Sequence, residues 1–174
     1  MQSDTSANEI SEESKLRATN LHMHGLTENS AYALTINDIE WITAHFNDAR
    51  QLLEEDRFQT AVHCLASYRW HSMPRVKLAV LWAGIEGMFG ASSEIRFRIS
   101  LYIARFLHAS DSGARKELFD SVKKLYNSRS KAVHGAKIKG DLNVAVEESA
   151  EILRNLIKQC AINKSLPNED ELVP

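Results

Sequence analysis

The chain has 174 residues, of which 44% are hydrophobic and 25% charged, a balance that excludes a disordered chain and fits one globular domain with tails better than two domains. The net charge of −2 predicts no global attraction to nucleic acid, and no apolar run reaches the roughly 18 residues of a membrane span. Only seven Gly and three Pro are present, and neither type occurs between residues 35 and 71, which favours long helices over short strands.

The first expected elements follow a polar segment. Residues 1–34 are rich in Ser, Thr, Asn and Glu and lack apolar periodicity, so we expect a flexible polar and acidic arm. Apolar residues at helical spacing begin at Thr35 and predict a first helix through Leu53. A second helix is expected over Phe58–Tyr68, and the Met73-Pro74 step separates it from the third, since Pro is well placed just inside a new helix.

The third helix, 74–89, is apolar nearly all round, which predicts a position in the centre of a bundle. Gly90 is expected to end it, and Ser92 or Ser93 to cap the fourth helix, whose apolar stripe reaches Phe106. The last two helices are expected to start at Asp111 or Ser112 and at Asp141 or Asn143.

No strand and no internal repeat is predicted. The whole pattern predicts an all-α fold, an up-and-down bundle of five or six helices over residues 35–165, followed by an acidic tail over 166–174.

The fifth expected helix carries a local excess of positive charge. Between Arg115 and Lys139 there are eight basic residues against two acidic ones, an excess of +6 that suits a polyanion such as RNA. The alternative is an ordinary solvated lysine-rich face. The lysines that we expect to bind RNA are Lys123, Lys124, Lys131 and Lys137.

At about 100° per residue, this helix separates two notable side chains. Arg129 falls within an apolar stripe formed by Leu118, Val122, Leu125, Ala132 and Val133, whereas His134 lies on the polar face with Asn127 and Ser130. A buried Arg129 needs a counter-charge, and Glu86 on the most apolar helix is the expected partner. His134, beside Gly135 at the end of the helix, is either a capping cation or a general acid or base.

Three ordered segments resemble a known family. Tyr126 to Gly135, with Arg and His five residues apart at the end of a long helix, is similar to the signature of HEPN domains. Leu81–Phe89, which contains Trp82 and Glu86, and Glu94–Ser100 resemble the Apea-like branch of that superfamily, and the match covers about residues 56–156. Ser130 follows the arginine, where nuclease members often have Asn, Asp or His.

The resemblance implies a HEPN-like bundle acting as a metal-independent endoribonuclease, without a cofactor, that leaves 2′,3′-cyclic phosphate and 5′-OH ends. By position, His134 would activate the 2′-OH or protonate the leaving oxygen, and Arg129 would stabilise the phosphate. Asn127, Ser130 and Glu86 would support this pair. The resemblance also implies a homodimer with a shared cleft, and a toxin or antiviral effector with an antitoxin or other regulatory protein as partner.

Two alternatives stay open at this point. One is a non-catalytic HEPN dimer that binds RNA, a nucleotide or a protein partner through the same groove. The other is a purely structural helical dimer in which Arg129 only neutralises Glu86.

The cysteines and the other potential ligand residues predict no further site. Cys64 and Cys160 stand alone on apolar helical stretches, which indicates buried thiols in a reducing compartment. No metal-binding spacing and no Gly-rich phosphate loop is present. No leader with an apolar core opens the sequence, so we expect a cytoplasmic protein without membrane contact.

Overall fold

The structure is a computed structural model that describes residues 2–3, 11, 16–17, 34–90, 95–136 and 141–172. The chain divides into two compact units, Met1–Tyr32 and Ala33–Pro174. In the first unit, β1 (Gln2–Ser3) pairs with β2 (Leu16–Arg17) in antiparallel register, Gln2 opposite Arg17. The sequence does not predict this ladder, because two residues a side are too few to leave a periodic apolar pattern.

The second unit is all-α, as predicted. Its elements are α1 (Ile36–Leu52), α2 (Asp56–Ser67), the 3₁₀ turn η3 (Tyr68–Trp70), α3 (Pro74–Phe89), α4 (Ile95–Leu107), α5 (Ser112–Val133), α6 (Leu142–Asn163) and α7 (Glu169–Leu172). Six of these helices have twelve residues or more, and the described residues add a four-residue helix that the sequence did not predict.

The helix boundaries follow from the capping residues of the sequence. Thr35 and Asp38 form a reciprocal capping box at the start of α1. Asp111 accepts hydrogen bonds from two backbone N–H groups at the start of α5, and Asp141 does the same for one at the start of α6, as expected. Gly90 ends α3 with φ at +67°, a conformation that suits glycine. The predicted cap at Ser92 or Ser93 lies outside the described residues.

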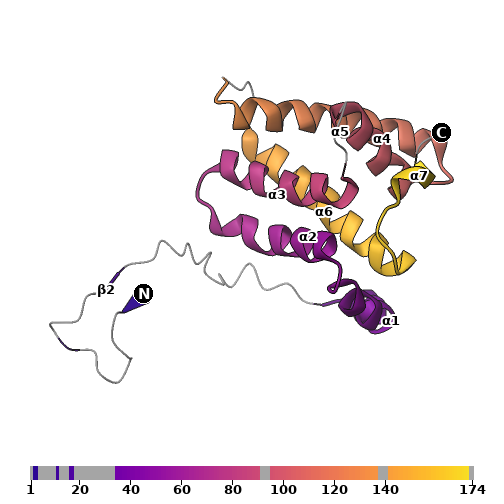
Figure 1. Ribbon diagram of the computed structural model, residues 1–174, viewed down its shortest axis with the longest axis horizontal. Coiled ribbons are helices and arrows are strands. Elements are labelled where there is room, and N and C mark those ends of the chain that lie inside the picture. Colours follow the sequence, from indigo (N-terminus) through magenta and orange to yellow (C-terminus); the bar gives the residue numbers. More distant parts are fainter. Residues whose placement is uncertain are drawn as a thin grey trace. The chain divides into compact units, whose positions relative to one another are not determined.

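Helix α3 lies at the centre of the unit, between α2 and α5 in Figure 1 and packed against α6. Its side chains Leu78, Leu81, Trp82, Ile85, Met88 and Phe89 are fully buried. The one polar atom of Trp82 is satisfied, because its indole Nε1 donates to Ser149 Oγ at 3.1 Å. The expectation of a central apolar helix is therefore confirmed.

A close approach of backbones holds α2 against α3. Gly84 faces α2 so closely that a Cβ at this position would lie 2.9 Å from Cys64 Cβ and 3.1 Å from Leu153 Cδ2. Any larger residue at position 84 would have to separate the helices.

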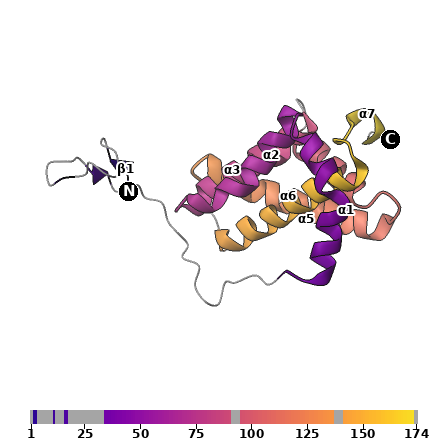
Figure 2. The ribbon, with the colours of Figure 1, turned by 90° about the horizontal axis from the view of Figure 1, so that it is seen from below.

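Helix α1 lies across the C-terminal half of α6 at one end of the helical unit (Figure 2). Lys164 pairs with Asp48 at 3.4 Å, and the Lys158 ammonium lies 5.1 Å from the centre of the Trp41 ring. Leu52 is nevertheless the one buried residue of α1.

At the other end of the chain, residues 166–172 pack onto the body of the unit. Arg105 donates to the carbonyl of Leu172 at 2.8 Å, and the Leu172 side chain is buried. Cys64 and Cys160 are free and buried, as predicted, and burial raises the pKa of the Cys160 thiol to about 12. Within the described residues, no helix combines the length and apolarity needed to cross a membrane.

Candidate functional site

The C-terminal turn of α5 carries His134. The residue occupies the C-cap position, where its backbone N–H donates to the carbonyl of Ser130. Gly135 then takes φ at +72°, and the N–H of Ala136 donates back to the carbonyl of Lys131 at 3.0 Å. This pattern closes a helix with a left-handed glycine, so the prediction that Gly135 stops the helix is confirmed.

Arg75, at the start of α3, holds this turn in place. Its Nη1 donates to the carbonyls of Lys131 and Ala132 at 3.3 and 2.9 Å, and its Nη2 donates to that of Ala136 at 2.9 Å. The last carbonyls of a helix lack partners within the helix and carry partial negative charge, so a guanidinium satisfies both needs. The turn that bears His134 is therefore fixed from a different helix.

Arg129 lies five residues before His134, on a different face of α5, and points to α3. Its Nη2 is 3.1 Å from Glu86 Oε1 and donates to Oε2 at 3.2 Å, and its guanidinium lies 5.5 Å from the centre of the Tyr126 ring. The predicted pairing of Glu86 with Arg129 is thus confirmed. Water still reaches the pair, since the Arg129 and Glu86 side chains are 21% and 25% exposed.

Burial affects the ionisable groups around this pair, and one nitrogen of Arg129 lacks a partner in the described part of the chain. Burial raises the pKa of Glu86 above its ordinary value of 4.5, and the charge of Arg129 opposes the rise. Burial also raises the pKa of Tyr126, with a further contribution from the negative charge of Glu86. Arg129 Nε is buried without a hydrogen-bond partner among the described residues.

His134 contrasts with Arg129, because its side chain is exposed and makes no hydrogen bond within the described residues. No hydrogen bond or ion pair joins the two side chains in that part of the chain, in keeping with their expected divergence around the helix. One neighbour departs from the prediction: Val133, expected on the buried stripe, is 48% exposed. The apolar stripe of α5 therefore ends at Ala132, where the helix runs past the body of the unit.

The supporting polar residues lie on the outer face of α5. Asn127 is exposed and accepts a hydrogen bond from Arg96 of α4 at 3.2 Å, and Ser130 is partly buried. Lys131 is exposed. Lys123 is partly buried, with its ammonium 5.5 Å from the centre of the Phe119 ring. Lys137 lies outside the described residues.

Lys124 faces a different environment. It lines an open groove of about 540 Å³ between α5 and α6. Four carboxylates, those of Glu117, Asp120, Asp141 and Glu148, line the same groove. One lysine among four acids gives a surface that repels a polyanion, so the basic excess of α5 is not spread evenly around the helix.

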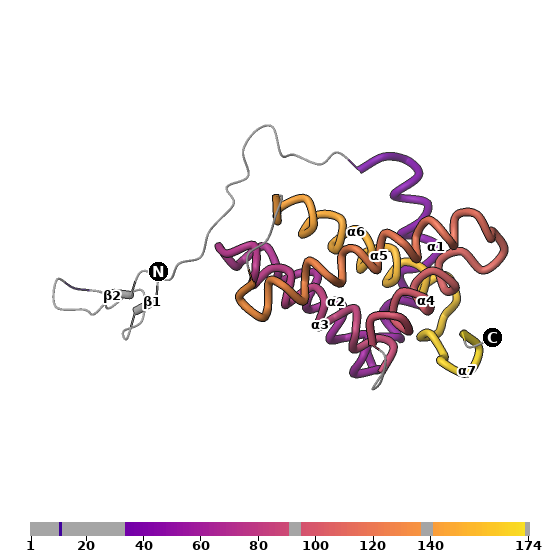
Figure 3. Tube along the Cα trace, turned by 90° about the horizontal axis from the view of Figure 1, so that it is seen from above, coloured from indigo at the N-terminus to yellow at the C-terminus, as the bar shows by residue number. Residues whose placement is uncertain are grey.

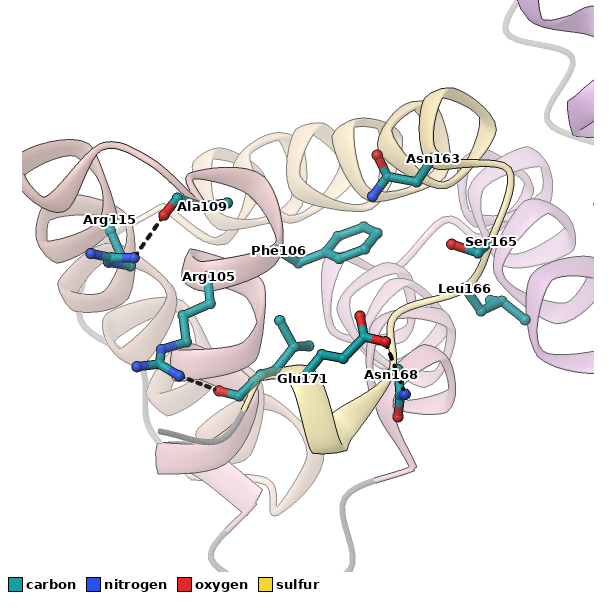
Figure 4. Close-up of a pocket in the computed structure, with 10 residues that line it drawn as sticks. Arg105, Phe106, Ala109, Arg115, Asn163, Ser165, Leu166, Asn168 and Glu171 are labelled. Atoms are coloured by element: carbon teal, nitrogen blue, oxygen red, sulfur yellow. Dashed lines mark hydrogen bonds between the residues drawn. The ribbon is translucent and has the colours of Figure 1, made fainter.

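A second cavity, of about 310 Å³, lies at the far end of α5 (Figure 4). Arg105, Phe106 and Arg115 line it, with residues of the segment 163–172. Both arginines are engaged with carbonyls, those of Leu172 and Ala109. None of the residues predicted for the site lines this cavity, and the described residues contain no cluster of three metal-ligating side chains.

Sequence reasoning missed Arg75, Arg96 and Phe97. The position of Arg75 in the first turn of a helix could have been noticed in the sequence. A cation there is unfavourable with the helix dipole, so its guanidinium is expected to find a hydrogen-bond acceptor on another element. Phe97 and Arg96 gave no such indication, because their contacts with α5 depend on how α4 and α5 pair.

Comparison with known proteins adds no assignment. No family model, no curated protein and no solved structure matches the chain.

Proposed function

We propose that the protein is a HEPN-type endoribonuclease that cleaves RNA without a metal ion and leaves 2′,3′-cyclic phosphate and 5′-OH ends. The observation that carries the proposal is the exposed imidazole of His134 on a turn whose carbonyls Arg75 binds and that Gly135 closes, five residues after a partly exposed arginine. Catalysis by a single imidazole requires such a fixed and accessible group. The resemblance of the Arg129–His134 segment to the HEPN signature supplies the substrate class.

In the proposed reaction, the neutral imidazole of His134 takes the proton of a ribose 2′-OH, and the 2′-oxygen attacks the adjacent phosphorus. The bond from phosphorus to the 5′-oxygen breaks, and the leaving oxygen receives a proton, from water or from a second imidazolium. Negative charge builds on the phosphate oxygens during this step, and a guanidinium stabilises it. Arg129 has this role in the proposal, while one edge of its guanidinium stays on Glu86.

The reaction needs a 2′-OH, so DNA is a substrate analogue that should bind but resist cleavage. On the resemblance, we further propose a homodimer that brings two His134 turns to one cleft, and a cytoplasmic setting in bacterial defence or a toxin–antitoxin pair. An antitoxin or other regulatory protein would then restrain the activity.

The test is cleavage of single-stranded RNA in the presence of EDTA. We expect cleavage by the wild type and a loss of about 10²-fold or more in His134→Ala, because positioned acid–base groups contribute that much. His63→Ala, at an exposed histidine of α2, is the matched control and should cleave normally. Equal cleavage by His134→Ala and the wild type, or activity that disappears with EDTA, would rule the proposal out.

The second candidate is a non-catalytic protein that binds RNA, a nucleotide or a protein partner with the same surface. The orientation of Arg129 favours it, because this side chain turns to Glu86 and not to His134. Binding of RNA by the wild type without any 2′,3′-cyclic phosphate product would support this candidate over the nuclease.

A further inference from the structure

One face of α5 forms a continuous line of side chains that ends at His134. Its members recur every three or four residues and span about 80° of the helix circumference. We call this line the α5 strip; it consists of Lys116, Phe119, Lys123, Asn127, Ser130 and His134. Lys116, Asn127 and His134 are exposed, the other members are partly buried, and the strip contains no acidic residue.

Helix α4 adds an aromatic ring and a cation to this strip. The two helices lie side by side in Figure 3. The ring of Phe97 meets that of Phe119 edge-on, with centroids 5.7 Å apart, and Phe97 remains 51% exposed. Arg96 is exposed and donates to the Asn127 side chain through Nη1. The exposed Phe97 ring therefore lies beside Phe119, over which the Lys123 ammonium sits, and directly after Arg96 in the chain.

This combination has a specific chemical meaning. Single-stranded nucleic acid is held by aromatic rings on which bases stack, together with cations that follow the phosphates. The strip has cations but no acidic residue beside the exposed ring, which favours a negatively charged partner over an apolar protein surface. The acid-lined groove lies on a neighbouring face of α5, centred roughly 125° around the helix from the strip, with Asp120 at its near edge, so the charge distribution favours a polyanion on the strip over the groove.

We propose that the α5 strip, with Arg96 and Phe97, is a binding track for single-stranded RNA, in which a base stacks on Phe97 and the backbone passes Lys123 towards His134. Phe119 and His134 are 15 residues apart, or about 22 Å along the helix, so the track holds several nucleotides upstream or downstream of the scissile bond. This inference rests on the proposed function for its direction towards His134, but binding can be measured without cleavage.

The experiment measures the anisotropy of a labelled single-stranded oligoadenylate, with every variant in a His134→Ala background so that the RNA stays intact. Phe97→Leu keeps an apolar contact with Phe119 but removes the stacking ring, and we expect about tenfold weaker binding. Phe46→Leu is the matched control, since Phe46 is an exposed phenylalanine of α1, and it should bind like the parent.

Two further arms test the nature of the contact. Lys123→Gln should weaken binding and reduce the slope of log affinity against log salt by about 0.7, as expected for one lost phosphate contact, whereas Lys158→Gln on α6 should not. Double-stranded RNA hides its bases, so its binding should be weaker and insensitive to Phe97→Leu.

The proposal is overturned if Phe97→Leu binds the oligoadenylate as tightly as the parent. It is also overturned if the substitution changes only the sedimentation of the protein, because that result would identify this face as a protein–protein contact. The two proposals fail separately. A wild type that cleaves RNA with Phe97→Leu unimpaired in binding keeps the nuclease and removes the track. A wild type that binds through Phe97 but never cleaves keeps the track and removes the nuclease.

Discussion

Helices α1 and α3 are nearly equal in length, 17 and 16 residues, and both are rich in large apolar side chains, yet they are used differently. Seven residues of α3 are buried, against Leu52 alone in α1. The apolar residues of α1 lie mostly on the side away from α6, with Ile36, Ile39 and Phe46 exposed to 74%, 52% and 58%. Apolar content therefore does not measure what a helix contributes to the core; the number of neighbours that surround it does.

The largest expected effect tests the centre of α3. Gly84→Ala should lower the free energy of unfolding by about 2 kcal/mol, because the new methyl group would lie 2.9 Å from Cys64 Cβ. Gly87→Ala, one turn along, is the matched control: a Cβ there meets nothing within 4 Å, so the gain in helix propensity should stabilise the protein by up to about 1 kcal/mol. Urea unfolding measures both, and equal shifts in the same direction would contradict the close approach of α2 and α3.

The next effect tests the N-terminal end of α3. Arg75→Ala removes the hydrogen bonds to three carbonyls at the end of α5 and should cost about 1.5 kcal/mol. Amide hydrogen exchange should accelerate in the last turn of α5 and not in its first turns. Lys116→Ala, at an exposed cation near the other end of α5, should change neither. Unaltered exchange around His134 in Arg75→Ala would show that the turn does not depend on this clamp.

A smaller effect concerns Glu86, on the partly exposed edge of α3, whose contribution to the free energy of unfolding should depend on pH in a known direction. Burial raises the pKa of Glu86 above 4.5, so the folded state holds this proton more tightly than the unfolded chain does. The stability that this group contributes is present below pH 4.5 and is lost as the pH rises through the raised pKa.

Glu86→Gln should remove that dependence. Because Gln is the neutral isostere of the protonated carboxyl, the variant and the wild type should be similarly stable at the acidic end, and the variant should become the more stable of the two as the pH rises through the raised pKa. Urea unfolding over a pH series measures the effect, and Glu117→Gln, at an exposed position of α5, should follow the wild type throughout. Parallel curves for the wild type and Glu86→Gln would contradict the raised pKa.

The smallest effect is expected in α1. Ile39→Ala should change the free energy of unfolding by less than about 0.5 kcal/mol, because the Ile39 side chain is already half exposed in the folded unit. A loss above about 1 kcal/mol, measured in the same urea assay, would mean that this face of α1 is covered in the folded protein.

The contrast between the two helices also marks how far the sequence could predict the structure. The boundaries of α3 and the caps of α5 and α6 depend on local chemistry, namely Pro74, Gly90, Asp111 and Asp141, and they were predicted. The pairing of Glu86 with Arg129 was predicted as well, since each charge falls on an apolar surface and needs a partner.

What the sequence did not predict depends on tertiary arrangement. The periodic apolar residues of α1 do not reveal which side faces α6, because Trp41 and Leu52 lie on one side and Ile39 and Phe46 on the other. Arg75 and Phe97 act on α5 from separate helices, and their contacts depend on how those helices pack together. The exposure of Val133 depends on where α5 leaves the body of the unit.

The two cysteines have a practical consequence for every experiment above. Burial raises the pKa of both thiols, that of Cys160 to about 12, so at neutral pH they are protonated and shielded from reagents. A cysteine introduced on the surface can therefore be labelled selectively with both native cysteines left in place. Fluorophores or spin labels attached at exposed positions of α5 outside the strip, such as Ser112 and Val133, would then report directly on nucleic acid arriving at α5.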